Sequence, residues 1–117
     1  MTDLDAVTGW IEGYIRAWHS NDPAEIGELF AENAAYYTEP HREPWRGRDT
    51  IVEQWLARED GRDWSFTWFP VTVGPDLSIV QGVTTYPGKV FSNLWLIRLD
   101  QVGQCREFTE WWMEQPA

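Results

Sequence analysis

The sequence predicts an α+β fold in which a mostly antiparallel sheet packs against helices on one side. Apolar residues recur at helical spacing in several segments before about residue 59. From residue 64 onward, long runs alternate apolar and polar residues, and clusters of Gly, Pro and Asp separate the runs. With 117 residues the chain has room for one core, so we expect a single domain over residues 1–117.

Three helices are expected in the first half of the chain. The first carries apolar residues at helical spacing, namely Leu4, Val7, Ile11, Ile15 and Trp18. The second begins at Asp22, a good N-cap, and Pro23, which fits the first helical position. Its buried stripe is expected to consist of Ile26, Leu29 and Phe30.

The third helix is expected from about Arg48 to Glu59, with Gly61 suited to its end. Its inward positions are Ile51, Val52, Trp55 and Leu56. Before it, Ala34–Thr38 reads as a short strand, and Pro40, Pro44 and Gly47 break up the segment that follows.

Four longer strands are expected in the second half of the chain, at Trp64–Val73, Leu77–Tyr86, Asn93–Leu99 and Gln104–Glu114. Gly74-Pro75-Asp76 and Pro87-Gly88 supply turns, and the last two strands form a hairpin across Asp100–Gly103. Trp64, Phe66 and Trp68 alternate onto one face of the first of these strands.

The composition excludes several classes of protein. A net charge of −10 argues against nucleic-acid binding, which needs clustered Lys and Arg. No apolar stretch approaches the roughly 20 residues that cross a bilayer, and the N-terminal segment lacks a signal-peptide pattern. The single cysteine, Cys105, allows no internal disulfide. We therefore expect a cytoplasmic protein that binds neither nucleic acid nor membrane.

Several short sequence motifs follow one another in a characteristic order along nearly the whole chain. They are Trp18-His19-Ser20-Asn21-Asp22, Leu29-Phe30 before Asn33-Ala34, Pro40 and Gly47 around a loop, and Trp111-Trp112 on the last strand. In this order the chain resembles the NTF2-like superfamily in its SnoaL-like branch, which includes polyketide cyclases and ketosteroid isomerase. The resemblance implies a curved sheet wrapped into a cone around about three N-terminal helices, with a deep pocket. It also implies a homodimer formed through the outer face of the sheet.

Beside ketosteroid isomerase, Tyr14 looks like the tyrosine of the oxyanion hole, and Glu39-Pro40 stands where that enzyme's general base precedes a proline. Trp55 and Trp112 fall at positions of pocket aromatics. Trp95 replaces the protonated aspartate that completes the oxyanion hole. The resemblance thus implies a related pocket but argues against steroid isomerisation itself.

Glu39 is the first candidate for chemistry. A carboxylate surrounded by aromatic side chains is short of water, which favours proton transfer to it. Tyr14 can then donate a hydrogen bond to an oxygen that becomes negative, with the indole N–H of Trp95 as a second donor. The alternative is that Glu39 lies exposed at a strand end and pairs with Arg42 or Arg46.

Glu110 is the second candidate carboxylate. If Trp112 faces the pocket, strand alternation places Glu110, Phe108 and Arg106 on the same face. Glu110 then shares a proton with Glu39, or orients a substrate hydroxyl or a water, or forms a buried ion pair with Arg106 or Arg98. In the reversed register, Glu107 and Thr109 face inward with Trp111 instead.

Nine Trp in a small domain exceed the usual need of a core, so some are expected to line a pocket for a flat, apolar molecule. The candidate ligand-binding residues are Trp18, Trp55, Trp68, Trp95, Phe108, Glu110 and Trp112. His41 beside scattered carboxylates lacks metal-ligand spacing, and no phosphate-binding loop is present, so neither metal nor cofactor is expected.

Three functions remain open from the sequence. The first is an enzyme without cofactor that moves a proton on an apolar substrate, as isomerases, cyclases and hydratases do, with Glu39 as base. The second is a binding module for a small apolar molecule. The third is a dimeric scaffold whose pocket is filled by its own tryptophans. Fold alone does not choose among them.

Overall fold

The computed structural model describes residues 3–58, 61 and 63–116. Its elements are α1 (Leu4–Ser20), α2 (Pro23–Glu28), β1 (Phe30–Tyr37), β2 (Trp45–Arg46), α3 (Arg48–Ala57), β3 (Ser65–Val73), β4 (Ser78–Tyr86), β5 (Lys89–Leu99) and β6 (Cys105–Glu114). The strands form one sheet in the order β2-β1-β6-β5-β4-β3. Neighbouring strands are antiparallel, apart from the parallel pair β1 and β6.

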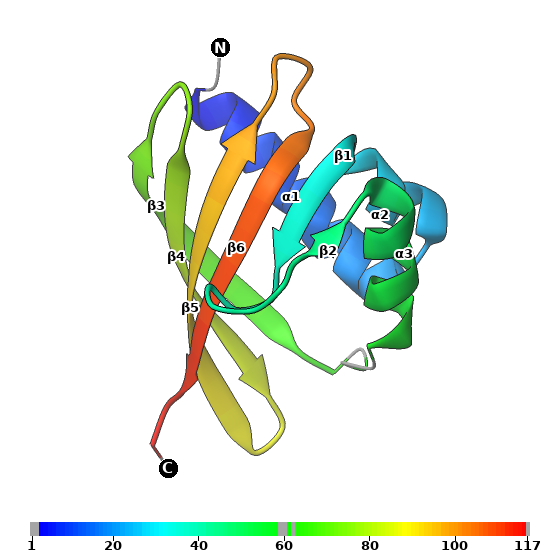
Figure 1. The fold of residues 1–117 in the computed structure, drawn as a ribbon. Helices are drawn as coiled ribbons and strands as arrows, with labels where there is room; N and C mark the ends of the chain where they lie inside the picture. The colour runs from blue at the N-terminus through cyan, green and yellow to red at the C-terminus, as the bar shows by residue number, and fades with distance from the viewer. Residues whose placement is uncertain (1–2, 59–60, 62, 117) are drawn as a thin grey trace.

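The sheet is curved and open, and the helices lie on one of its faces (Figure 1). Helix α1 runs diagonally behind the strands, while α2 and α3 stand together at the end of the sheet formed by β1 and β2. The predicted α+β architecture, a mostly antiparallel sheet wrapped around three N-terminal helices, is confirmed. No helix within the described ranges is long and apolar enough to span a membrane.

The starts of α1 and α2 follow from side-chain caps. The Asp3 carboxylate accepts a hydrogen bond from a backbone N–H in the first turn of α1. Asn21 ends the helix in the left-handed conformation, with φ of 52°. Asp22 then caps α2 by accepting from the Ala24 N–H at 2.8 Å, and Pro23 takes the first helical position, as predicted.

The second helix is shorter than predicted because its last expected residues enter the sheet. Leu29 is the C-cap of α2, and its carbonyl accepts a 2.8 Å hydrogen bond from the Cys105 N–H. Phe30 is paired with Cys105 at the start of β1, which ends at Tyr37. The expected strand, which began at Ala34, is therefore extended at its N-terminal end by pairing with β6.

The third helix also differs from the prediction. It ends at Ala57, where the Arg58 N–H bonds to the Trp55 carbonyl and closes the last turn early. Glu59 lies outside the described residues, and Gly61, with φ of 72°, follows the helix without capping it.

Leu56, predicted to face inward, is 41% exposed. Ile51 and Trp55, four residues apart, take the buried face of α3, and Leu56 stands about 100° around the helix from Trp55. The segment before the helix contains a strand that the sequence did not indicate, since Trp45 pairs with Tyr36 across β2 and β1.

A bulge interrupts the alternation of β6 near its start. Arg98 is paired with Glu107, but the next residue, Leu99, is paired with Cys105, so Arg106 is one residue too many for the ladder. The simple alternation predicted for this strand therefore holds only beyond the bulge.

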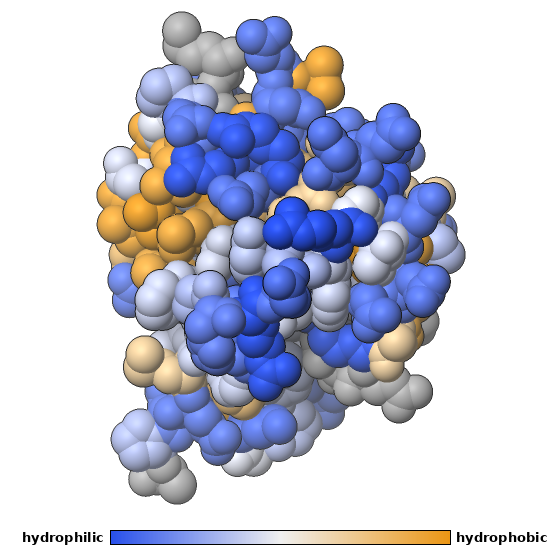
Figure 2. Space-filling view, viewed as in Figure 1, coloured by the Kyte–Doolittle hydropathy of each residue, from blue (hydrophilic) through white to orange (hydrophobic). Residues whose placement is uncertain are grey.

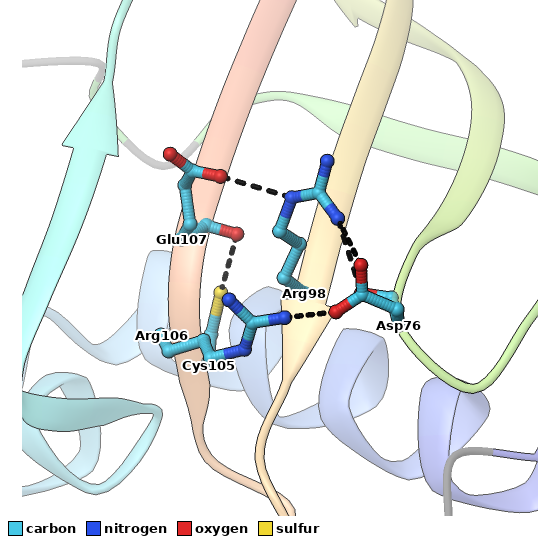
Figure 3. A network of polar contacts seen from close by, with 5 residues as sticks. All are labelled: Asp76, Arg98, Cys105, Arg106 and Glu107. Atoms are coloured by element: carbon cyan, nitrogen blue, oxygen red, sulfur yellow. Dashed lines mark hydrogen bonds and ion pairs between the residues drawn. The ribbon is translucent and has the colours of Figure 1, made fainter.

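Arg106 accordingly does not share the inner face with Phe108, contrary to the prediction. It binds Asp76 on the outer face, together with Arg98 (Figure 3). The Arg98 Nε also donates to Glu107 Oε2 at 2.9 Å. This cluster links β5 and β6 to the turn before β4 and leaves both arginines engaged on the outer face.

The core lies between α1 and the inner face of the sheet, where α1 contributes Val7, Trp10, Ile11, Tyr14, Ala17 and Trp18. The outer face is open and carries large apolar side chains, among them Phe69, Val71, Trp111 and Met113. Figure 2 shows hydrophobic residues gathered on this face over β3 and β4.

Candidate functional site

A cavity of about 440 Å³ opens between the helices and the inner face of β4, β5 and β6. Its aromatic lining consists of Tyr14, Trp18, Tyr86, Phe91 and Trp112. Its charged lining consists of Glu39, Arg58, Lys89 and Glu110, and Thr38, Thr84 and Asn93 supply uncharged polar groups. The volume is suited to a small molecule. The lining is more polar than the tryptophan-lined pocket that the sequence predicted.

The register of the sheet places these side chains together. Beyond the bulge, alternate residues of β6 face inward, and Glu110 and Trp112 both line the cavity. Asn93 is paired with Trp112, and Trp95 with Glu110, so Asn93 is a diagonal neighbour of Glu110. Glu107 lies on the outer face with Arg98, which identifies Glu110 as the inward glutamate of this strand.

A chain of polar side chains holds the Glu110 carboxylate in place. Thr84 Oγ1 donates to Asn93 Oδ1 at 2.7 Å, and Asn93 Nδ2 donates to Glu110 Oε2 at 2.7 Å. Trp95 Nε1 reaches the same oxygen at 3.0 Å. Because Thr84 and Asn93 are buried, they hold the carboxylate in one direction with little competition from water.

Two expectations are corrected by this chain. Arg98 and Arg106, expected as ion-pair partners of Glu110, are engaged on the outer face by Asp76 and Glu107. Trp95, expected as a second donor to the ligand, gives its N–H to Glu110 and lies buried. An indole has one N–H, so it cannot serve both acceptors with full strength.

Two tyrosines form the second fixed polar group. The Tyr14 and Tyr36 hydroxyls lie 2.7 Å apart and are both buried. Burial raises the pKa of Tyr14 well above its usual value, and it also raises the pKa of Tyr36. The negative charge of Glu110 raises both pKa values further, whereas the positive charge of Arg58 lowers them. Both phenols therefore stay protonated at neutral pH and remain hydrogen-bond donors.

Arg58 joins this group from the end of α3. Its guanidinium lies over the rings of Trp45 and Trp55, 5.7 Å and 5.3 Å from their centroids. It also forms a hydrogen bond with Tyr36 and lines the cavity. Arg58 is the C-cap of α3, so the end of this helix stands beside the tyrosine pair.

Glu39 occupies the rim of the cavity. Its side chain is 22% exposed, and its Oε2 lies 2.9 Å from Arg42 Nε and 3.2 Å from His41 Nε2. Both partners are largely exposed to solvent. The ion pair with Arg42, the alternative considered for Glu39, is thus formed, although the carboxylate still borders the cavity.

The aromatic residues selected from the sequence divide into two groups. Trp18 and Trp112 border the cavity. Trp55, Trp95 and Phe108 are fully buried and pack around the ring of Tyr14, with centroids 4.8, 4.6 and 5.6 Å away. Trp68 packs against the core from β3 and is not part of the cavity lining. The buried aromatics hold Tyr14 in position.

Sequence reasoning missed Tyr36, which is bound to Tyr14, and several residues of the cavity lining, namely Thr38, Arg58, Thr84, Tyr86, Lys89, Phe91 and Asn93. For Thr84 and Asn93 the signal was present, since both stand at inward positions of strands where apolar residues are the rule. Such positions require a polar partner.

Metal and thiol chemistry find little support among the described residues. In those ranges, no three side chains of the metal-binding types come close enough together to hold an ion. Burial raises the pKa of the Cys105 thiol to about 12, so its nucleophilic thiolate form is scarce at neutral pH.

The family model described as a SnoaL-like domain matches residues 11–108. No curated protein matches the sequence.

Solved structures match over almost the whole chain. A candidate ketosteroid isomerase from Kribbella flavida is 19% identical, with a TM-score of 0.76 over 100% of this chain and 84% of its own. An NTF-2 like protein of unknown function from Burkholderia xenovorans is 14% identical, with a TM-score of 0.73 over 97% and 89%. A ketosteroid isomerase-like protein from Erwinia carotovora atroseptica is 17% identical, with a TM-score of 0.68 over 97% of both chains. At these identities the likeness establishes the fold alone.

Proposed function

Because the chain belongs to the SnoaL-like family of the NTF2-like superfamily, we propose that its cavity binds a small, mostly apolar molecule and moves a proton on it without a cofactor. The reaction class is abstraction of a proton from a carbon beside a carbonyl group, as in isomerisation, cyclisation or hydration. The base is Glu110, and the donor to the carbonyl oxygen is Tyr14.

The observation that carries this proposal is the pairing of a fixed carboxylate with a fixed phenol in one cavity. Glu110 is held by Asn93 and Trp95, and Tyr14 is held by Tyr36. The charge of Glu110 contributes to the raised pKa of Tyr14, so the two groups act on one another inside the fold. Proton abstraction needs both a base and a donor held in advance of the reaction.

The proposed step balances within these groups. The carbon–hydrogen bond of the substrate breaks, and its proton passes to the Glu110 carboxylate. The electron pair moves onto the carbonyl oxygen, giving an enolate that accepts a hydrogen bond from the Tyr14 hydroxyl. The two phenols share one hydrogen bond, which uses one of their two protons, so the second proton can be donated to the substrate oxygen. Return of the proton from Glu110 to another atom completes the isomerisation.

Glu39 is the competing candidate for the base. Its Oε2 is already engaged by Arg42 and His41, both largely exposed, whereas Glu110 is held by two buried, uncharged donors. An exposed ion pair is weak and competes with water, so it does not fix the direction of the Glu39 carboxylate as the buried Asn93 and Trp95 fix that of Glu110. We therefore assign Glu110 to the reaction and Glu39 to the rim.

A binding module without chemistry is the second candidate function. It is favoured by Trp95, which stands in place of the second oxyanion-hole acid of ketosteroid isomerase and gives its N–H to Glu110. Only Tyr14 of the two expected donors then remains for the substrate oxygen. One donor stabilises the transition state less than two donors do. A cavity with this single donor is therefore also compatible with binding alone.

Native mass spectrometry of freshly purified protein tests ligand binding first. We expect a bound small molecule that is retained in Trp111→Ala and lost or weakened in Trp112→Ala, because these exposed neighbours lie on opposite faces of β6. Incubating the identified ligand with protein in deuterium oxide then tests proton transfer. Deuterium uptake at the carbon beside the carbonyl supports the enzyme, and binding without uptake supports the module.

A further inference from the structure

Lys89 is the only lysine in the chain, and it lies in the lining of the cavity. It follows a tight turn in which Pro87 and Gly88 connect β4 to β5, and Gly88 has φ of 84°, which favours glycine. The turn pairs Lys89 directly with Tyr86. In a chain of net charge −10, this ammonium and the Arg58 guanidinium are the positive charges among the described residues that line the cavity.

Aromatic rings flank this ammonium. Lys89 Nζ lies 5.5 Å from the Phe91 ring centroid and 5.7 Å from that of Tyr86, within the range of cation–π contacts. Phe91 in turn meets Trp112 edge to face at 5.8 Å. Within the described ranges Lys89 has no carboxylate partner, whereas Arg42 is paired with Glu39 at the rim.

We infer that Lys89 binds an anionic group of the ligand, and that the ligand is an aromatic acid. This inference rests on the proposed function, because it assigns the substrate class of the same cavity. The rings of Tyr86, Phe91 and Trp112 contact the apolar body of the molecule. The Lys89 ammonium, which Tyr86 and Phe91 flank without neutralising it, meets the negative charge.

The strand geometry sets the size of this ligand. Lys89, Phe91 and Asn93 are alternate residues of β5 that all line the cavity. At about 3.4 Å per residue, roughly 14 Å separates the Cα atoms of Lys89 and Asn93. An acid of two or three fused rings spans that interval, with its charged end at Lys89 and its reacting end beside Glu110, the neighbour of Asn93.

Two fluorescent probes with one skeleton test the inference. 8-Anilino-1-naphthalenesulfonate carries an anionic group, and N-phenyl-1-naphthylamine is the same molecule without it. Titration gives the Kd of each probe for the wild-type protein, Lys89→Met and Lys89→Arg. Trp112→Ala and Trp111→Ala report whether a probe occupies the cavity or the outer face.

We expect Lys89→Met to weaken binding of the sulfonate roughly tenfold, because a charge-assisted contact is lost, and to leave binding of the neutral probe unchanged. Lys89→Arg restores most of the affinity for the sulfonate. Added salt weakens binding of the sulfonate alone.

Two other results separate the inference from the function it rests on. In the first, Trp112→Ala weakens binding of both probes, but Lys89→Met leaves both Kd values unchanged or raises both equally. The cavity then binds aromatic molecules, and the anionic site is overturned. If neither probe responds to Trp112→Ala, the cavity does not take aromatic molecules, and the proposed function is overturned together with this inference.

Discussion

Asn93 on β5 donates a 2.7 Å hydrogen bond to Glu110 Oε2 on the adjacent strand β6, and receives one from Thr84 on β4. Three neighbouring strands thus contribute one side chain each to a single polar chain at the cavity wall. Any slip in the strand register would break it, so the direction of the Glu110 carboxylate is set by the sheet itself.

Thr84→Val removes the donor that fixes the Asn93 amide. The Asn93 Oδ1 is then left buried without this partner, and we expect a loss of about 1–3 kcal/mol in the free energy of unfolding. Thr85→Val is the matched control, since Thr85 is exposed on the other face of β4 and its change should stay within about 0.5 kcal/mol. Urea denaturation of both variants measures the difference, and equal stabilities would remove the polar chain from this account.

The buried tyrosines predict loss of stability at alkaline pH. Burial raises the pKa of Tyr14 and Tyr36 above 10.0, so the unfolded chain releases these protons at lower pH than the folded protein. Their contribution to stability is complete below pH 10 and falls above it, by up to about 1.4 kcal/mol per pH unit for each phenol. Urea midpoints between pH 9 and 11 test this, with a shallower fall in Tyr36→Phe. An unchanged slope in that variant would contradict the assignment.

Gly82 on β4 is required by close packing. A Cβ there would lie 2.5 Å from Phe66 Cζ and 2.9 Å from the Thr67 carbonyl oxygen. Phe66 stacks on Trp95 at 4.6 Å, so Gly82→Ala has to displace that ring, and we expect a cost of about 1–3 kcal/mol in the free energy of unfolding.

The control is Gly9 in α1, where an added Cβ meets no atom within 4 Å. Gly9→Ala should raise stability by up to about 1 kcal/mol, because alanine favours the helix. Thermal melts of the two variants should therefore move in opposite directions. A neutral Gly82→Ala would mean that Phe66 has room to move.

The outer face of the sheet leads to a prediction about assembly. Phe69, Val71, Trp111 and Met113 are 55%, 54%, 47% and 66% exposed on this face. We propose that two copies of the chain pair through it, burying roughly 800 Å² on each partner if the dimer is stable. Phe69→Glu places a charge in the contact and is expected to give monomers in sedimentation velocity.

Val102→Glu is the control for that experiment, because Val102 is 80% exposed in the turn between β5 and β6. This variant should sediment as the wild type does. Monomeric wild-type protein at high concentration would contradict the proposed dimer.

Much of the fold was predictable because its signals are local. Asp22-Pro23 marked a helix start, and alternating residues marked the long strands. The predictions were wrong where pairing with a distant segment of the chain determines the local structure. Phe30 fits a helical stripe, yet its pairing with Cys105, far along the chain, draws it into a strand. The bulge at Arg106 likewise depends on the partner strand, so alternation within β6 did not indicate it.

The site was predictable only in part, for the same reason. The sequence left two registers open for β6 and placed Glu110 in the cavity only in the one where Trp112 faces inward, which is the register that the structure has. For Glu39 it offered Arg42 or Arg46 as partner, and the structure has Arg42. Tyr36 matched no motif, because its role arises from a contact with Tyr14 across the core. Asn93 stood out only as a polar residue at an inward strand position, and its partner lies on the next strand.

The most direct test of the central claim compares Glu110→Gln with Glu39→Gln for deuterium uptake by the bound ligand. Both changes keep the size of the side chain and remove its ability to act as a base. We expect Glu110→Gln to slow uptake at least about 100-fold while the ligand still binds, and Glu39→Gln to retain most of the wild-type rate. Undiminished uptake in Glu110→Gln, or its loss in Glu39→Gln alone, would contradict the account.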